Sequence, residues 1–276
     1  MTGNGPAPAG TAAQGRPQPR RAETVLITGA SSGIGRELAR LYASDGARLV
    51  LIARSEDKLR QLADELAARY GIETHAVPAD LSRPGSSREI VAALTQRRID
   101  VDVLVNNAGF GAHGSVADIG AERQLGMIEV NVAALTELTA RLLPGMLARR
   151  RGAILNVAST AAFQPGPNQA VYCATKAYVL SFTEALAEEV RGSGVRVSCL
   201  APGPTDTRFA ATAGMSGTRL FRRGTMDAGR VARAGHDGLR RGKTLVIPGL
   251  RNRILAFSVR LSPRALVTKI AAHLQA

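Results

Sequence analysis

Tryptophan is absent from this 276-residue sequence, and aromatic residues of all kinds make up only 4% of it. Proteins that bind single-stranded nucleic acid commonly stack the bases on aromatic side chains. So low an aromatic content argues against a surface of that kind, and the sequence contains no other nucleic-acid-binding motif. We therefore expect no nucleic-acid partner.

Cysteine and histidine are scarce as well. The two cysteines, Cys173 and Cys199, form no CxxC pair, and so few thiols favour the reducing cytoplasm over a disulfide-stabilised protein. The histidines are scattered, with none at metal-ligand spacing from a second ligand: His75, His113, His236 and His273. We expect a cytoplasmic protein without a bound metal.

Long apolar runs are missing too, and none reaches the roughly 18 residues that span a bilayer. The first 21 residues are rich in glycine, proline and alanine, and they lack the apolar segment of a signal peptide. Residues 1–21 are therefore expected to form a disordered arm.

Acidic residues are scarce at the two ends of the chain, which explains its net charge of +14. Residues 22–215 contain 20 Lys and Arg against 20 Asp and Glu, whereas residues 216–276 contain 13 basic residues and two acidic ones. The second stretch ends in an apolar stripe with helical spacing, formed by Leu266, Val267, Ile270, Ala271 and Leu274. A basic amphipathic segment at 249–276 permits peripheral contact with an anionic membrane. A solvated, arginine-rich face is the alternative.

Short apolar runs alternate with helical patterns from residue 23 onward. The apolar runs predict strands at 24–28, 48–53, 73–78, 101–105, 153–158 and 195–201. Helical spacing predicts helices at 34–45, 56–70, 83–97, 121–148 and 171–191. This alternation is typical of an α/β protein with a doubly wound parallel sheet of the Rossmann type, whose ligands bind at the carboxyl ends of the strands.

The alternation weakens after residue 205. Residues 205–230 are expected to form a polar lid with short helical pieces, followed by an edge strand at 244–248 and a helix after Pro263. We thus expect one domain at 22–248, between the arm and the basic segment at 249–276.

A glycine-rich turn, TGASSGIG at 28–35, follows the first predicted strand and opens a helix. Glycines let the backbone approach a pyrophosphate closely, and a helix N-terminus favours anionic groups. In this context the motif predicts a dinucleotide site. Its residues are Gly29, Ser31, Ser32, Gly33, Ile34 and Gly35.

The end of the second strand indicates which dinucleotide. A site selective for NAD places an acidic residue there for the ribose 2′-hydroxyl. Here the sequence is Ile52-Ala53-Arg54-Ser55, with no acid before Glu56. Because a planar guanidinium suits a 2′-phosphate, Arg54 favours NADP(H) over NAD(H).

Tyr172 and Lys176 lie four residues apart in a predicted helix, so they share one face. Tyrosine, with an ordinary pKa of about 10, is a poor base unless a neighbouring cation stabilises its phenolate. Ser159 follows the strand at 153–158, where its hydroxyl would hold a substrate oxygen. Taken singly, a tyrosine and a lysine at this spacing are more often a surface pair on a helix, and a serine after a strand is more often a turn residue. A catalytic reading requires all three together.

Five motifs occur together in order: TGxxxGxG at 28–35, NNAG at 106–109, Ser159, YCATK at 172–176 and PGPTDT at 202–207. Over about residues 23–210 the chain resembles the short-chain dehydrogenase/reductase family. The sequences of its motifs are similar to those of a bacterial branch of short-subunit dehydrogenases related to DltE. The resemblance implies hydride transfer between a nicotinamide cofactor and a carbonyl or alcohol substrate, with Tyr172 as general acid and base, assisted by Lys176 and Ser159.

The resemblance also implies roles for other residues. Asn131 would kink its helix and hold a water in a proton relay to Lys176. Asp80 would hold the adenine amino group, and Thr207 would lie near the nicotinamide carboxamide. Asn107, Ala108 and Gly109 would border the adenine ribose. Family members are commonly homodimers or homotetramers built on the helices expected at 121–148 and 171–191.

Some questions stay open at this point. A non-catalytic nucleotide-sensing protein on the same scaffold is the alternative function, although such a protein is expected to lose the tyrosine, lysine or serine. His113 is either a surface loop residue or part of the substrate pocket. Apolar residues in the lid suggest a medium-sized, partly apolar substrate: Phe209, Met215, Leu220, Phe221 and Met226.

Overall fold

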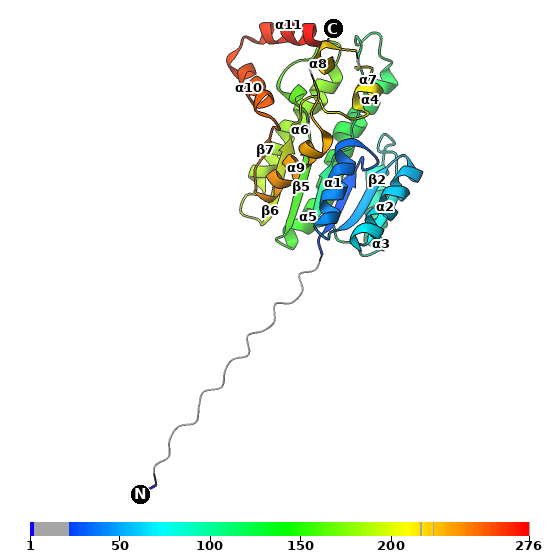
Figure 1. The fold of residues 1–276 in the computed structure, drawn as a ribbon, viewed down its shortest axis with the longest axis vertical. Coiled ribbons are helices and arrows are strands. Elements are labelled where there is room, and N and C mark those ends of the chain that lie inside the picture. Colours follow the sequence, from blue (N-terminus) through cyan, green and yellow to red (C-terminus); the bar gives the residue numbers. More distant parts are fainter. Residues whose placement is uncertain (3–21, 216, 223, 276) are drawn as a thin grey trace.

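The computed structural model describes residues 1–2, 22–215, 217–222 and 224–275, so the predicted arm lies almost wholly outside it. Within these residues seven parallel strands form one sheet in the order β3-β2-β1-β4-β5-β6-β7 (Figure 1). The strands are β1 (Thr24–Thr28), β2 (Arg48–Ala53), β3 (Thr74–Pro78), β4 (Val103–Asn106), β5 (Gly152–Val157), β6 (Val195–Leu200) and β7 (Leu245–Val246). The doubly wound α/β fold is confirmed.

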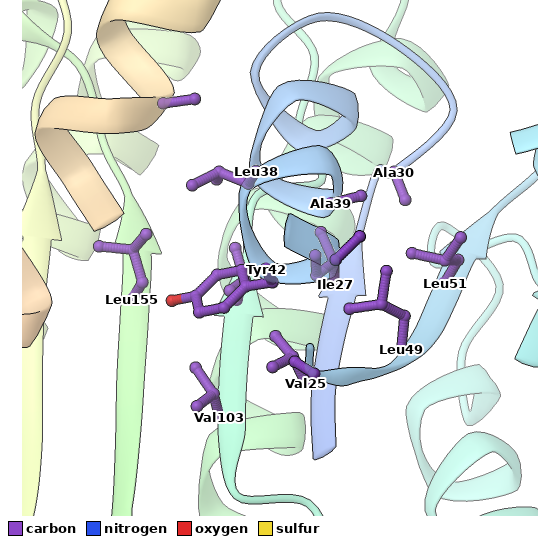
Figure 2. Close-up of a cluster of buried hydrophobic side chains, with 14 of the residues drawn as sticks. Val25, Ile27, Ala30, Leu38, Ala39, Tyr42, Leu49, Leu51, Val103 and Leu155 are labelled. Atoms are coloured by element: carbon purple, nitrogen blue, oxygen red, sulfur yellow. The ribbon is translucent and has the colours of Figure 1, made fainter. Parts of the chain in front are cut away.

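Helices cover both faces of the sheet. One face carries α1 (Gly33–Ser44), α2 (Glu56–Tyr70) and α9 (Ala228–Arg240); the other carries α3 (Ser86–Gln96), α5 (Ala134–Ala148) and α6 (Ala170–Glu189). Because both faces are covered, central strands such as β1 are buried at every residue and read as continuous apolar runs. Figure 2 shows Leu38 and Tyr42 of α1 packed over Val25 and Ile27 of β1.

Short turns return each helix to the amino ends of the strands. They pass through Gly46, Gly71, Arg98, Arg150 and Gly192, all of which have positive φ. The loops that follow the strands lie at the other edge of the sheet, the edge where ligands bind in this architecture.

Helix α9 was not predicted, because the lid was expected to continue to residue 230 and no helix was expected between it and the edge strand at 244–248. Its sequence contains Gly229, Gly235 and Gly238, and glycine weakens a helix. In the structure two of these glycines face the sheet. A Cβ on Gly235 would lie 2.7 Å from Leu200 Cδ2, and one on Gly238 only 2.3 Å from Val246 Cγ2. The glycines therefore let α9 pack closely against β6 and β7.

Two other boundaries differ from the prediction. The expected helix at 121–148 is divided into α4 (Ala121–Ile128), a π-helical turn η1 (Glu129–Ala133) and α5. The edge strand expected at 244–248 shortens to the two residues of β7, which pair with β6.

The lid and the C-terminal segment lie beyond the carboxyl edge of the sheet (Figure 1). The lid contains α7 (Phe209–Ala213) and α8 (Arg219–Arg222); the segment contains α10 (Leu250–Ser258), the 3₁₀ turn η3 (Val259–Leu261) and α11 (Arg264–Gln275). Helix α11 packs on α8 and buries Val267, Ala271 and Gln275. Among the described helices, none is both long and apolar enough to cross a bilayer.

Candidate active site

A cavity of about 460 Å³ opens among the loops that follow β1 to β6. Nearly all residues predicted for the cofactor and the reaction line it: Gly29, Ser31, Ser32, Gly33, Ile34, Arg54, Asp80, Asn107, Ala108, Gly109, Ser159, Tyr172, Lys176 and Thr207. The two predicted residues that do not line it, Gly35 and Asn131, are buried. The fold thus brings together segments from residue 29 to residue 207.

The glycine-rich turn has the geometry that a pyrophosphate requires. Gly29 and Gly33 have φ values of 66° and 54°, and a Cβ on Gly35 would lie 2.4 Å from Gly29 O. Larger residues are therefore excluded from a turn that runs directly into α1. The first N–H groups of that helix have no partner within the helix, so they remain available to an anion. These residues fit the phosphates of a dinucleotide.

The NNAG segment fastens this turn to β4. The Asn107 side chain donates to the carbonyl oxygens of Thr28 and Gly29 at 3.0 and 3.2 Å. The backbone N–H groups of Asn107 and Ala108 both donate to Thr28 Oγ1 at 3.0 Å. Thr207 approaches the turn from the lid side, since a Cβ on Gly33 would lie 2.9 Å from its Cγ2. Asn107 therefore shapes the cofactor cleft through the backbone.

Arg54 and Asp80 lie at the end of the cavity formed by β2 and β3. Arg54 is exposed and makes no hydrogen bond or ion pair with another described residue. Asp80 Oδ1 accepts hydrogen bonds from the backbone N–H and the hydroxyl of Ser82 at 3.0 and 2.7 Å. These bonds, together with the nearby charge of Arg54, lower the pKa of Asp80. A cation without a partner beside a fixed carboxylate fits an adenine ribose with a 2′-phosphate.

Ser159 and Tyr172 meet through their hydroxyl groups. Ser159 follows β5 and caps the 3₁₀ turn η2 (Thr160–Phe163), with its Oγ accepting from Ala161 N at 3.1 Å. Tyr172 lies in the first turn of α6 and is 7% exposed. Burial raises the pKa of Tyr172 well above its ordinary value, and the hydrogen bond with Ser159 opposes that rise. In the structure it is therefore Ser159 that favours the phenolate.

Lys176 lies one helical turn after Tyr172, as the spacing predicted. Its Nζ donates to Val157 O at 2.9 Å and lies 5.8 Å from the centroid of the Tyr172 ring. The side chain is 5% exposed, and burial lowers the pKa of Lys176 to about 8. The ammonium thus stands near the tyrosine, and its own protonation changes close to neutral pH.

Asn131 lies in the π-helical turn η1 and is buried. Its Oδ1 accepts from Phe110 N at 3.1 Å, and its Nδ2 donates to Phe110 O and Thr175 Oγ1, both at 3.0 Å. Both amide hydrogens are therefore in use, and the side chain has none left to donate to a water. The interrupted helix agrees with the predicted kink, and the side chain joins the loop after β4 to α6.

The lid forms the wall of the cavity beside Tyr172. The Phe209 and Tyr172 rings have centroids 5.2 Å apart, and Gly111 permits this contact because a Cβ there would lie 2.8 Å from Phe209 Cζ. Gln169 donates to Met215 Sδ at 2.7 Å. Phe209, Met215 and Phe221 line the cavity, whereas Met226 does not.

Gln275 of α11 also lines the cavity, although no pattern in the sequence predicts it. The residue is 4% exposed, and its buried Oε1 has no hydrogen-bond partner among the described residues. His113 is half-buried and lies within 2.7 Å of Gln275 O, so it supports the end of α11 and does not line the cavity. Burial raises the pKa of the neighbouring Cys173 thiol to about 11, which suits a packing residue.

Sequence reasoning therefore missed one class of residue: polar side chains brought to the cavity by tertiary contacts. Gln164, Gln169 and Gln275 belong to it. None lies in a recognisable motif, and only the docking of α11 on the lid places the third of them here. Within the described part of the chain, no three histidine, cysteine or acidic side chains gather as metal ligands would.

The family model for short chain dehydrogenases matches residues 23–216. A short chain dehydrogenase of Pseudocercospora fijiensis is 37% identical over 193 residues, which are 68% of this chain and 62% of that protein. A Streptomyces violaceoruber protein described as a candidate ketoacyl reductase of the granaticin polyketide synthase is 40% identical over 187 residues, covering 67% and 68%. The chain therefore belongs to the short-chain dehydrogenase/reductase family.

Solved structures agree with this assignment. A short-chain dehydrogenase from Sphingobium yanoikuyae in complex with NADPH is 34% identical, with a TM-score of 0.79 over 87% of this chain and 93% of that one. A family member from Burkholderia phymatum in complex with NAD is 29% identical, with a TM-score of 0.78 over 87% and 92%. The protein is an oxidoreductase of this family that uses a nicotinamide dinucleotide.

Proposed function

We propose that the protein is an NADP(H)-dependent reductase that converts a ketone or aldehyde into an alcohol and catalyses the reverse reaction. One observation carries the proposal: Ser159, Tyr172 and Lys176 converge on the cavity that also contains the glycine-rich turn. A proton-transferring tyrosine and a dinucleotide cradle in one cleft are what hydride transfer to a carbonyl requires.

The bound cofactor would supply or accept the hydride, and the chain would handle the oxygen and its proton. Ser159 Oγ would hold the carbonyl oxygen beside the Tyr172 hydroxyl, which donates a proton as the alcohol forms. Burial raises the pKa of Tyr172, so the phenol is protonated at neutral pH and carries the proton that reduction consumes.

Lys176 would return a proton to Tyr172 after the tyrosine has donated its own to the substrate oxygen. Since burial lowers its pKa to about 8, it gains and loses a proton readily near neutral pH. Asn131 would act as a positioning residue, because its side-chain bonds join Phe110, which lines the cavity, to Thr175 of α6. If a water belongs to the relay, the backbone of the π-helical turn would hold it.

The preference for NADP(H) is supported by Arg54, which has no partner among the described residues. Replacing it in Arg54→Asp should raise the KM for NADPH about 10- to 100-fold, the effect of losing a charge-assisted hydrogen bond, and change the KM for NADH much less. Arg60→Gln, on the exposed side of α2, is the matched control. If Arg54→Asp changes both constants equally, Arg54 does not select the cofactor.

The sequence also supports finer assignments. The strings NAGFG at 107–111 and YCATKAYVLSFTEAL at 172–186 favour the DltE-related branch. The Tyr178 ring, 38% exposed and stacked on Phe182, favours assembly of a homodimer or homotetramer through α6. Two buried free thiols, Cys173 and Cys199, favour the cytoplasm.

The test is consumption of NADPH with a panel of ketones, aldehydes and acyl-chain carbonyls. Tyr172→Phe should lower kcat about 10²- to 10⁴-fold, the range for a general acid. Tyr178→Phe on the same helix is the matched control and should keep full turnover. Equal turnover by Tyr172→Phe would refute the catalytic role of Tyr172. Tight NADPH binding without turnover of any substrate would instead support the nucleotide-sensing alternative.

A further inference from the structure

The side of α10 that points away from the domain is apolar. Leu250, Ile254 and Phe257 of α10 recur at intervals of four and three residues, which places them on one helix face, and Leu261 follows in the adjoining turn η3. Their exposed fractions are 70%, 59%, 61% and 76%. We call these four residues the α10 stripe. Large apolar side chains that gather at such exposure mark an interaction surface.

The opposite side of α10 is anchored to the domain. Ala256 is buried, and Asn252 Nδ2 donates to Pro248 O at 2.8 Å. Asn252 also packs against Gly203 at the rim of the cavity, since a Cβ on Gly203 would lie 2.6 Å from Asn252 Nδ2. The helix cannot rotate to bury its stripe without losing these contacts, so the stripe is presented outward as a fixed surface.

Cations flank the stripe on both sides. At 100° per residue along α10, Arg251 lies on one side of the stripe and Arg253 on the other, and Arg260 follows in η3. Helix α11 adds Arg264 and Lys269, and all five side chains are exposed. Residues 249–276 contain no Asp or Glu. An apolar face between cations with long stems is the arrangement of a helix that lies in a membrane interface.

We propose that the α10 stripe docks on an anionic phospholipid surface. The four apolar side chains would enter the boundary between headgroups and acyl chains, while the flanking arginines would remain among the phosphates. A second copy of the chain is the less suitable occupant, because pairing two such faces would bring cations together without acidic partners. The sequence placed the apolar stripe on α11. There Val267 and Ala271 are buried and Leu266 and Ile270 are 50% and 52% exposed, whereas the α10 stripe is 59% to 76% exposed, so α10 carries the larger part of the surface. Docking does not depend on turnover and goes beyond the proposed function.

The experiment is sedimentation of the full-length protein with phosphatidylcholine vesicles that contain or lack phosphatidylglycerol. Wild type should bind only the anionic vesicles, and binding should weaken steeply between about 50 mM and about 500 mM NaCl as salt screens the cations. In the triple variant Arg251→Gln/Arg253→Gln/Arg260→Gln the partition coefficient should fall about a hundredfold, since each surface cation contributes about fivefold.

The apolar part of the surface is tested separately. Ile254→Glu/Phe257→Glu should abolish binding, whereas Val116→Glu/Leu125→Glu should retain most of it. The control residues are 60% and 64% exposed on another part of the molecule, and they introduce the same charge. NADPH binding and the melting temperature report whether each variant is folded. If the stripe variant does not fold, the triple arginine variant alone tests the proposal.

Three results would overturn the proposal. The first is equal binding of wild type to neutral and anionic vesicles, or to neither. The second is equal loss of binding in the stripe variant and its control. The third is a stripe variant that lowers the oligomeric mass of the protein in solution, which would show that a second copy covers the stripe.

Discussion

Replacing Lys176 by methionine should stabilise the free protein while it removes activity. The ammonium is 5% exposed, and its burial lowers the pKa of Lys176 from 10.5 to about 8. A folded-state pKa below the unfolded one means that folding disfavours the charged form. The free-energy cost of burying the charged ammonium is complete below pH 8 and disappears as the pH rises from about 8 towards 10.5. Over this interval the wild-type protein should therefore gain stability.

The structure also sets the size of the effect. The difference between a pKa of 10.5 and one of about 8 corresponds to about 3 kcal/mol at neutral pH. The substitution also removes the 2.9 Å hydrogen bond from Nζ to Val157 O, which offsets about 1–2 kcal/mol. Methionine has a similar length and fills the space. At about pH 7 we expect the free energy of unfolding of Lys176→Met to exceed that of wild type by about 1–2 kcal/mol.

The assay is urea unfolding of both proteins at about pH 7 and about pH 10. The advantage of Lys176→Met should vanish or reverse at the higher pH, because wild type has by then lost most of its burial cost. Lys58→Met, at an exposed position of α2, is the control and should change stability by less than about 0.5 kcal/mol at either pH. A Lys176→Met protein less stable than wild type by the same amount at both values would refute the reasoning.

Three further predictions concern packing and binding. Gly235→Val should lower the free energy of unfolding by about 1–3 kcal/mol by forcing α9 away from the sheet. Gly126→Ala in α4, where a Cβ would lie 3.5 Å from Phe110 Cζ, should not lower it, and chemical denaturation compares the two variants. For a carbonyl substrate that also carries a hydroxyl or N–H group, Gln275→Ala should raise the KM about 3- to 10-fold and leave the KM for NADPH unchanged, because that donor loses Gln275 Oε1 as its acceptor. Unchanged kinetics would remove Gln275 from the binding site. Asp102→Ala should cost about 2–3 kcal/mol, since the buried carboxylate accepts from Thr24 N at 3.0 Å, and a thermal shift below about 2 °C would contradict this.

Much of the fold could be predicted because its signals are local. Strands such as β1 and β2 are buried at nearly every residue, so they appear in the sequence as unbroken apolar runs. The meeting of Ser159 with Tyr172 was also predictable in outline. Both follow β5, and the carboxyl ends of parallel strands share one edge of the sheet.

Other features depend on contacts between distant segments. The glycines of α9 read as helix breakers, and only the nearness of Leu200 explains why Gly235 is needed. Gln275 enters the cavity because α11 packs on α8 and His113 holds its end, neither of which leaves a pattern in the sequence. The spacing of Lys176 suggested a cation that activates tyrosine, whereas burial and Ser159 dominate the pKa of Tyr172. Burial is a tertiary property, so composition could not supply it.

The turns at the amino ends of the strands have a practical consequence. None of Gly46, Gly71, Arg98, Arg150 and Gly192 lines the cavity. At Gly46, Gly71 and Gly192 a Cβ would meet no atom within 4 Å, but the positive φ of each disfavours any side chain. Exposed residues beside these turns, such as Arg69, Arg97 and Arg191, are therefore the natural attachment points for fluorophores, affinity handles or inserted peptides. A surface-immobilised enzyme held there would keep both its cleft and the α10 stripe facing the solution.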